Sequence, residues 1–192
     1  MKDRSDSELV GLVVEADDRA AFGELVERHK RGVFALLHRI LGRNEEIEDI
    51  AQNIFLAAYR GLKAFRQSAK FSTWLFRITY NHACTALRRY RTKREQMTVP
   101  HEEDEKGQLK EYEDTKGLNP ESSVLNKQVW AAVDRLPVQS RAVIELYYGR
   151  GLSYPEIAES LSLPLGTVKT HLHRARGKLR ELLVENPQAA ES

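Results

Sequence analysis

The stretch LSYPEIAESLSLPLGTVKTHLHRARGKLRELL, residues 152–183, carries the clearest structural signal in the chain. Ser153 and Glu156 have the spacing of a capping box, which predicts that a helix starts here. The run LPLG at 163–166 predicts a turn, and a second helix is expected to open at Thr167. The pattern is that of two short helices joined by a tight turn.

The second of these helices has two faces of different character. Val168, Leu172 and Ala175 recur at helical spacing and predict a buried stripe. The outer face holds basic and hydrogen-bonding side chains, and the candidate DNA contacts are Thr167, Lys169, Thr170, His171, His173, Arg174 and Arg176. Such a face fits the major groove of DNA, with phosphates further along the helix. We interpret the stretch as a DNA-binding helix-turn-helix; a helical hairpin with a solvated basic face is the alternative.

The rest of the chain is also predicted to be helical. Apolar residues recur at intervals of three and four over residues 19–41, 44–62 and 72–90, and a short helix is expected around Leu9. Asn44 is the expected N-cap of the second of these segments. No alternating strand pattern of useful length is present. These four helices are expected to make one bundle.

The composition changes between this bundle and the C-terminal helices. Residues 93–121 contain almost no aliphatic side chains and many acids, including the run HEEDE at 101–105. Such a segment cannot bury enough apolar surface to form a core, so it predicts a solvated tether. A second helical unit then begins near Ser122 and includes a helix around 140–148.

We therefore expect an all-α fold with two separately folded small helical domains, joined by a flexible acidic linker. The predicted divisions are 8–92, 93–121 and 122–185, the last containing the helix-turn-helix.

Composition excludes several classes of protein. The 192 residues include 30 Lys and Arg and 28 Asp and Glu, so a net charge of +2 identifies no partner. Cys84 is the only cysteine, which excludes an intrachain disulfide and a Cys-rich zinc site. His171 and His173 lie on different sides of a helix, so no metal or other cofactor is expected. The polar start and the lack of a long apolar run predict a cytoplasmic protein without membrane insertion.

Four motifs in a fixed order narrow the field. The runs IEDIAQNIFLAAY at 47–59, FSTWLFRITYN at 71–81, LPVQSR at 136–141 and GTVKTHLHRAR at 166–176 resemble regions 2 and 4 of the extracytoplasmic-function (ECF) sigma factors. These are sigma-E-like members of the sigma-70 family. The resemblance implies a bacterial protein that binds core RNA polymerase, directs it to the −10 and −35 elements of promoters and helps open the DNA. It also implies a role in an envelope or other stress response.

In this family the first motif docks on a helical coiled coil of the largest polymerase subunit. The resemblance thus implies polymerase contacts at Asp49, Gln52 and Asn53, with Phe55 helping to hold the helix in place. The implied partners are the beta and beta-prime subunits of the polymerase.

The second motif resembles the part that holds the non-template strand of the −10 element. The residues implied there are Arg77, Tyr80, Asn81, Arg88 and Arg89. Asn81 matches the position nearest a flipped-out base, the arginines are expected to meet phosphates, and Tyr80 is expected to offer a stacking face. Trp74 could be a melting wedge, but its helical spacing with Leu75 and Ile78 favours a place in the core.

The fourth motif falls where the family reads the −35 element, which agrees with the contacts expected from the basic helix face. In the family the linker threads through the polymerase cleft toward the RNA exit channel. Such proteins are often held inactive by an anti-sigma factor, so the resemblance implies one as a partner.

Two other classes of protein compete with this interpretation. A response regulator or one-component transcription factor also carries such a helix-turn-helix, but it needs a sensor or phosphoacceptor domain, and no strands are predicted here. An enzyme needs paired catalytic groups, whereas His29, His38 and His82 are scattered and no glycine-rich phosphate loop is present. We therefore expect no enzymatic activity.

Overall fold

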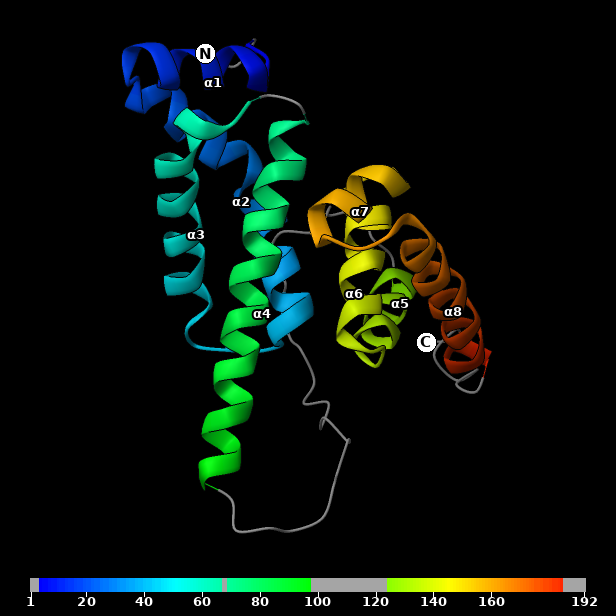
Figure 1. The fold of residues 1–192 in the computed structure, drawn as a ribbon. Helices are drawn as coiled ribbons and strands as arrows, with labels where there is room; N and C mark the ends of the chain where they lie inside the picture. Colours follow the sequence, from blue (N-terminus) through cyan, green and yellow to red (C-terminus); the bar gives the residue numbers. More distant parts are fainter. Residues whose placement is uncertain (1–3, 67–68, 98–123, 185–192) are drawn as a thin grey trace.

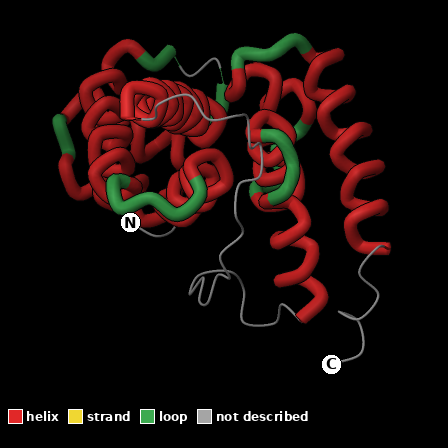
Figure 2. The backbone as a smooth tube through the Cα atoms, turned by 90° about the horizontal axis from the view of Figure 1, so that it is seen from below, coloured by secondary structure: helices red, strands yellow, loops and turns green. Residues whose placement is uncertain are grey.

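The computed structural model describes residues 4–66, 69–97 and 124–184. Within these ranges all regular structure is helical and no strand occurs (Figure 2). The predicted all-α fold is confirmed. Most of the predicted acidic linker, residues 98–121, lies outside the described residues.

The N-terminal unit is a bundle of four helices (Figure 1). They are α1 (Asp6–Ala16), α2 (Arg19–Leu41), α3 (Ile47–Gly61) and α4 (Phe71–Met97), with a 3₁₀ turn η1 (Leu62–Ala64) after α3. Helix α2 packs against the three others, and α3 also packs against α4. The predicted bundle is therefore present, with α2 as its centre.

Local signals explain where these helices begin and end. Helix α2 starts after Asp18, whose carboxylate accepts hydrogen bonds from the first turn, and stops at Gly42, which has a φ of 69°. Helix α3 starts at Ile47 and not directly after Asn44, the predicted N-cap. The Asn44 side chain instead accepts a hydrogen bond from Glu46 N at 2.8 Å and so caps a turn that precedes the helix. Helix α4 runs seven residues past its predicted end at Tyr90, since good helix formers follow.

The C-terminal unit holds α5 (Val124–Asp134), α6 (Val138–Ile144), a π-helical turn η2 (Glu145–Gly149), α7 (Tyr154–Leu161) and α8 (Leu165–Val184). Helix α8 packs against α5, α6 and α7. It begins two residues before the predicted Thr167, because the Pro164 carbonyl accepts from Thr167 N and Val168 N. The π turn replaces the end of the predicted 140–148 helix.

The two units pack directly against each other, with α7 along α4 and α6 against α2 (Figure 1). Their buried apolar side chains form one continuous cluster. Phe76 is buried over Gly32, where an added Cβ would lie 2.9 Å from the ring, and Ser160 Oγ donates to the Thr73 carbonyl at 3.2 Å. The two predicted helical units are present, and the structure adds a direct contact between them that the sequence did not predict.

A buried carboxylate marks the seam between the units. The Glu145 side chain is 2% exposed, and its oxygens lie 3.2 Å from Arg150 Nε and 3.5 Å from Arg39 Nε. Arg39, in α2, also reaches Asp134 Oδ1 at 2.6 Å and stacks its guanidinium 4.3 Å from the centre of the Trp130 ring. A buried charge is tolerated only when it is paired, so Arg39 is the main polar tie across the seam.

We expect Arg39→Ala to loosen the packing between the units, because it removes the ion pair to Asp134 and one of the two arginines at Glu145. Breaking a buried ion pair from one side costs about 3 kcal/mol or more. Small-angle scattering should give a larger radius of gyration than for the wild type, and the midpoint of thermal unfolding should fall.

The matched control is Arg31→Ala, which removes an exposed arginine from the same helix. Unchanged scattering and an unchanged midpoint for Arg39→Ala would contradict the assigned role of this side chain.

Candidate nucleic-acid interface

The residues implied by the first motif form an exposed stripe on α3. Asp49, Gln52 and Asn53 are exposed, whereas the Ile54 side chain is fully buried and Phe55 is half-buried against the core. The helix is therefore held by its apolar side and presents its polar side outward. The role of these residues stays a prediction.

Leu56 continues this stripe and was missed in the sequence. It is 46% exposed and follows Gln52 and Asn53 by one helical turn. The sequence did contain a signal for this exposure, because Leu56 lies outside the 3.6-residue repeat of buried apolar residues. The stripe therefore has an apolar element beside its polar side chains.

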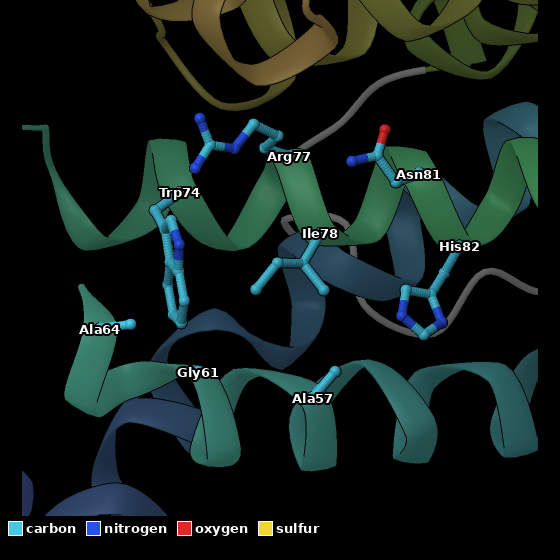
Figure 3. Close-up of a pocket in the computed structure, with 8 residues that line it drawn as sticks. All are labelled: Ala57, Gly61, Ala64, Trp74, Arg77, Ile78, Asn81 and His82. Atoms are coloured by element: carbon cyan, nitrogen blue, oxygen red, sulfur yellow. The ribbon is translucent and has the colours of Figure 1, made fainter.

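An open groove of about 510 Å³ lies between α3 and α4 (Figure 3). Its lining residues are Ala57, Gly61, Ala64, Trp74, Arg77, Ile78, Asn81 and His82. Trp74, Ile78 and His82 point toward α3, whereas Arg77 and Asn81 project from the other side of α4, where the C-terminal unit lies. The structure thus places Arg77 and Asn81 one helical turn apart on α4, where they line the groove from the side that faces away from α3.

Trp74 belongs to an aromatic cluster and also forms a wall of this groove. Its ring stacks on Phe65 at 4.9 Å between centres and lies 5.8 Å from Phe71. Gly61 allows the close approach, since a Cβ there would lie 3.2 Å from the indole. The packing agrees with the core interpretation of Trp74, although one face of the ring borders the groove.

Tyr80 does not offer the predicted stacking face in this arrangement. It is 9% exposed. Burial, followed by the interactions with the nearby Cys84, raises the pKa of Tyr80 to about 12, and Gln139 of α6 also lies close enough to affect it. Periodicity within α4 could not reveal this burial, and the stacking role of Tyr80 stays a prediction.

The two arginines further along α4 differ from each other. Arg89 forms an ion pair with Glu46 at the start of α3, and the Tyr90 hydroxyl donates to the same carboxylate at 3.0 Å. Arg88 is exposed, with Nη2 3.4 Å from the Thr85 hydroxyl. Arg89 is thus held by the bundle, and Arg88 is the more available of the two.

The outer face of α8 is basic and open. Lys169, Thr170, His173, Arg174 and Arg176 are exposed, and Thr167 and His171 are half-buried. The His171 ring is held by α6, because its Nδ1 lies 3.2 Å from Ser140 Oγ. The structure therefore presents all seven candidate side chains on or beside one helix face.

The helix that precedes the turn is fixed by the predicted capping box. The Glu156 carboxylate accepts from the Ser153 backbone N–H at 2.7 Å and from its hydroxyl at 2.6 Å. Lys70 of the N-terminal unit adds an ion pair at 2.8 Å. The hydrogen bond to Lys70 and those to Ser153 lower the pKa of Glu156 to about 2.

Other kinds of site were also sought in the described ranges. Over these residues no group of three His, Cys, Asp or Glu side chains is placed to hold a metal ion. None of the described helices is long and apolar enough to cross a membrane.

Family comparisons agree with this geometry. The model of Sigma-70 region 2 matches residues 25–93, and that of Sigma-70 region 4 matches residues 126–179. The ECF RNA polymerase sigma factor SigW of Bacillus subtilis is 37% identical over 176 residues, which cover 88% of this chain and 92% of SigW. This chain belongs to the ECF sigma factors. The ECF RNA polymerase sigma-E factor of Haemophilus influenzae is 36% identical, covering 85% of this chain and 87% of that protein.

Solved structures show the same fold as this ECF sigma factor. CnrH, solved in complex with the cytosolic domain of CnrY, is 28% identical and covers 97% of this chain and 99% of its own, with a TM-score of 0.65. The sigma factor RpoE of Bartonella quintana, solved with the anti-sigma factor NepR, is 23% identical over 84% of this chain and 96% of its own, with a TM-score of 0.66.

Family membership decides the function in outline. As an ECF sigma factor, the protein binds core RNA polymerase and directs it to specific promoters. The matched regions coincide with the two packed units, region 2 with the N-terminal and region 4 with the C-terminal unit.

The capping box predicts an acid sensitivity. The lowered pKa of Glu156 means that the ionised carboxylate stabilises the fold above its ordinary value of 4.5, and that this stability is lost as the pH falls toward about 2. At neutral pH, Glu156→Gln should lower the midpoint of thermal unfolding by about 2–4 °C, the effect of losing one cap. The variant's midpoint should also depend less on pH between 4.5 and 2.

Glu159→Gln is the control, since it neutralises an exposed acid on the same helix. Parallel pH profiles for the wild type and Glu156→Gln would count against the stabilising role of Glu156.

Proposed function

We propose that three surfaces divide the work of this sigma factor. The α3 stripe docks on core polymerase, the groove beside α4 captures a base of the opened −10 element, and the outer face of α8 reads the −35 duplex. The groove with Asn81 at its edge carries the proposal, because it joins apolar walls to polar groups suited to a base.

The α3 stripe suits a helical partner. Asp49, Gln52 and Asn53 supply charge and hydrogen bonds, and Leu56 supplies an apolar contact. Interfaces of this kind combine a small apolar centre with a polar rim. We assign the stripe to the beta-prime subunit of polymerase, with further contacts to the beta subunit elsewhere.

The groove suits a single unstacked base. Trp74 and Ile78 provide apolar walls, and the Asn81 carboxamide offers both a donor and an acceptor to a base edge. Arg77 is placed to meet the adjacent phosphate. Extruding a base costs a few kcal/mol of stacking, which capture here would offset and so favour DNA opening.

We also propose that the two units separate when the protein binds polymerase and a promoter. The −10 and −35 elements lie more than two turns of duplex apart, which is about 70 Å or more. In the packed arrangement α7 touches α4, so the two readers cannot reach both elements. Separation would also uncover Tyr80, and the free protein is expected to bind promoter DNA poorly.

The proposal also covers the compartment, the physiological response and a regulatory partner. We infer that the protein acts in the cytoplasm, catalyses no reaction of its own, and serves an envelope or other stress response. The complex of the Bartonella quintana sigma factor RpoE with the anti-sigma factor NepR supports an anti-sigma factor as a further partner.

With core polymerase, the protein is expected to direct run-off transcription from a limited set of promoters, and to comigrate with the polymerase. Transcript starts across a genomic library measure the first property, and size-exclusion chromatography measures the second. Absence of any promoter-specific transcript would contradict the function.

The docking stripe is tested in the same assay. Asp49→Lys should abolish comigration and transcription, whereas Glu15→Lys, an exposed acid-to-base change on α1, should not. Comigration of Asp49→Lys at the wild-type level would contradict the α3 assignment.

Asn81→Ala should reduce open-complex formation about tenfold, because one base contact of about 1.4 kcal/mol is lost. Permanganate footprinting of the holoenzyme measures opening, and competition with an upstream duplex measures −35 binding, which should change little. Thr85→Ala removes another exposed polar group of α4 and is the matched control. Equal losses of opening and −35 binding for Asn81→Ala would count against base capture.

A further inference from the structure

The side chain of Arg176 is held by phenols and not by carboxylates. Its Nε donates to the Tyr148 hydroxyl at 2.9 Å. Its guanidinium carbon lies 5.8 Å from the ring centres of Tyr147 and Tyr148. Across the part of the chain that the structure describes, no carboxylate lies within ion-pair distance of Arg176. By contrast, ion pairs with Asp or Glu hold Arg28, Arg39, Arg89 and Arg150.

This difference matters for the charge that α8 presents. A phenol hydroxyl is a polar acceptor and not a carboxylate, so Tyr148 fixes the direction of the guanidinium without forming an ion pair with it. Interactions with the neighbouring phenols, first that with Tyr148, raise the pKa of Arg176. A guanidinium has five N–H donors, and this hydrogen bond leaves four for a ligand.

Tyr148 adds a second donor at the same place. Its hydroxyl oxygen accepts from Arg176, so its own hydrogen points to another acceptor. The side chain is 55% exposed, the most exposed of the large aromatic side chains in the described ranges. It stands on the π turn η2, and π turns often mark functional positions.

The pair also lies where a DNA backbone would pass. Arg176 follows Lys169 by seven residues and His173 by three, so the three share one face of α8. Arg176 is about 10 Å further along the axis than Lys169. In helix-turn-helix proteins the start of the recognition helix meets base edges, and groups further along and on flanking elements meet phosphates.

We propose that Tyr148 and Arg176 form one preorganised binding site for a backbone phosphate of the upstream duplex. The Tyr148 hydroxyl and the guanidinium both donate to the phosphate, and the hydrogen bond between them sets the geometry in advance. Tyr148 is thus a DNA-positioning residue outside the recognition helix. The inference rests on the proposed −35 function of α8.

The test measures binding of the holoenzyme, the full chain bound to core polymerase, to a short fluorescein-labelled duplex taken from just upstream of a transcript start that the holoenzyme uses. Anisotropy is recorded over a range of salt concentrations. Arg176→Gln should flatten the plot of log affinity against log salt by about 0.9, the effect of one lost phosphate contact. Tyr148→Phe should weaken binding about tenfold at low salt, since a hydrogen bond to a charged group is lost.

The double variant separates a joint site from two independent contacts. Tyr148→Phe with Arg176→Gln should bind no more weakly than Arg176→Gln alone, whereas Tyr148→Phe with Arg180→Gln should show additive losses. Additive losses in the first pair would overturn the proposal. A lower unfolding midpoint for Tyr148→Phe with unchanged affinity and salt slope would also overturn it, because that result assigns the pair to packing alone.

A wild-type holoenzyme that does not bind the duplex would overturn this site together with the −35 assignment. Wild-type binding with unaffected Tyr148 and Arg176 variants would overturn the phosphate site and leave the proposed function standing.

Discussion

The buried charge of Glu145 is the constraint on which the arrangement of this molecule depends. Removing a carboxylate from water is costly, and two arginines from opposite sides of the seam offset that cost here. Ion pairs of this kind contribute little net stability compared with an apolar contact of the same shape, but they are specific about geometry. The seam is therefore fixed in its register without being held very tightly. That property fits the proposed separation of the two units on polymerase.

Local signals in the sequence predicted the helices well. The capping residues and Gly42 set the ends of α2 to the residue, and the Ser153–Glu156 box set the start of α7. The π turn η2 was not predictable, because such a turn has no pattern of its own in the sequence. Packing of the two units was also missed, since periodicity shows which face of a helix is buried and not which partner buries it.

The same distinction governs the candidate interface. Exposure of Asp49, Asn81 and Lys169 follows from helical periodicity, and the structure agrees with it. The burial of Tyr80 did not follow from the sequence, because Gln139, which lies near it, is more than fifty residues further along the chain. The hydrogen bond between Tyr148 and Arg176 was missed for the same reason, because the two residues are 28 positions apart in the sequence. Contacts between segments that are distant in the sequence are the part of such an interface that cannot be predicted from one sequence.

The close packing at Gly32 limits which residues related chains can carry at this position. Phe76 occupies the space above it so closely that any side chain at position 32 would displace the ring. Such a displacement would be felt at the seam with the C-terminal unit, because the Arg150 side chain approaches the same space. The residues at positions 32, 76 and 150 therefore cannot be substituted independently of one another if the two units are to stay packed together. A larger residue at the first position would therefore call for a change in the side chain or its conformation at one of the other two.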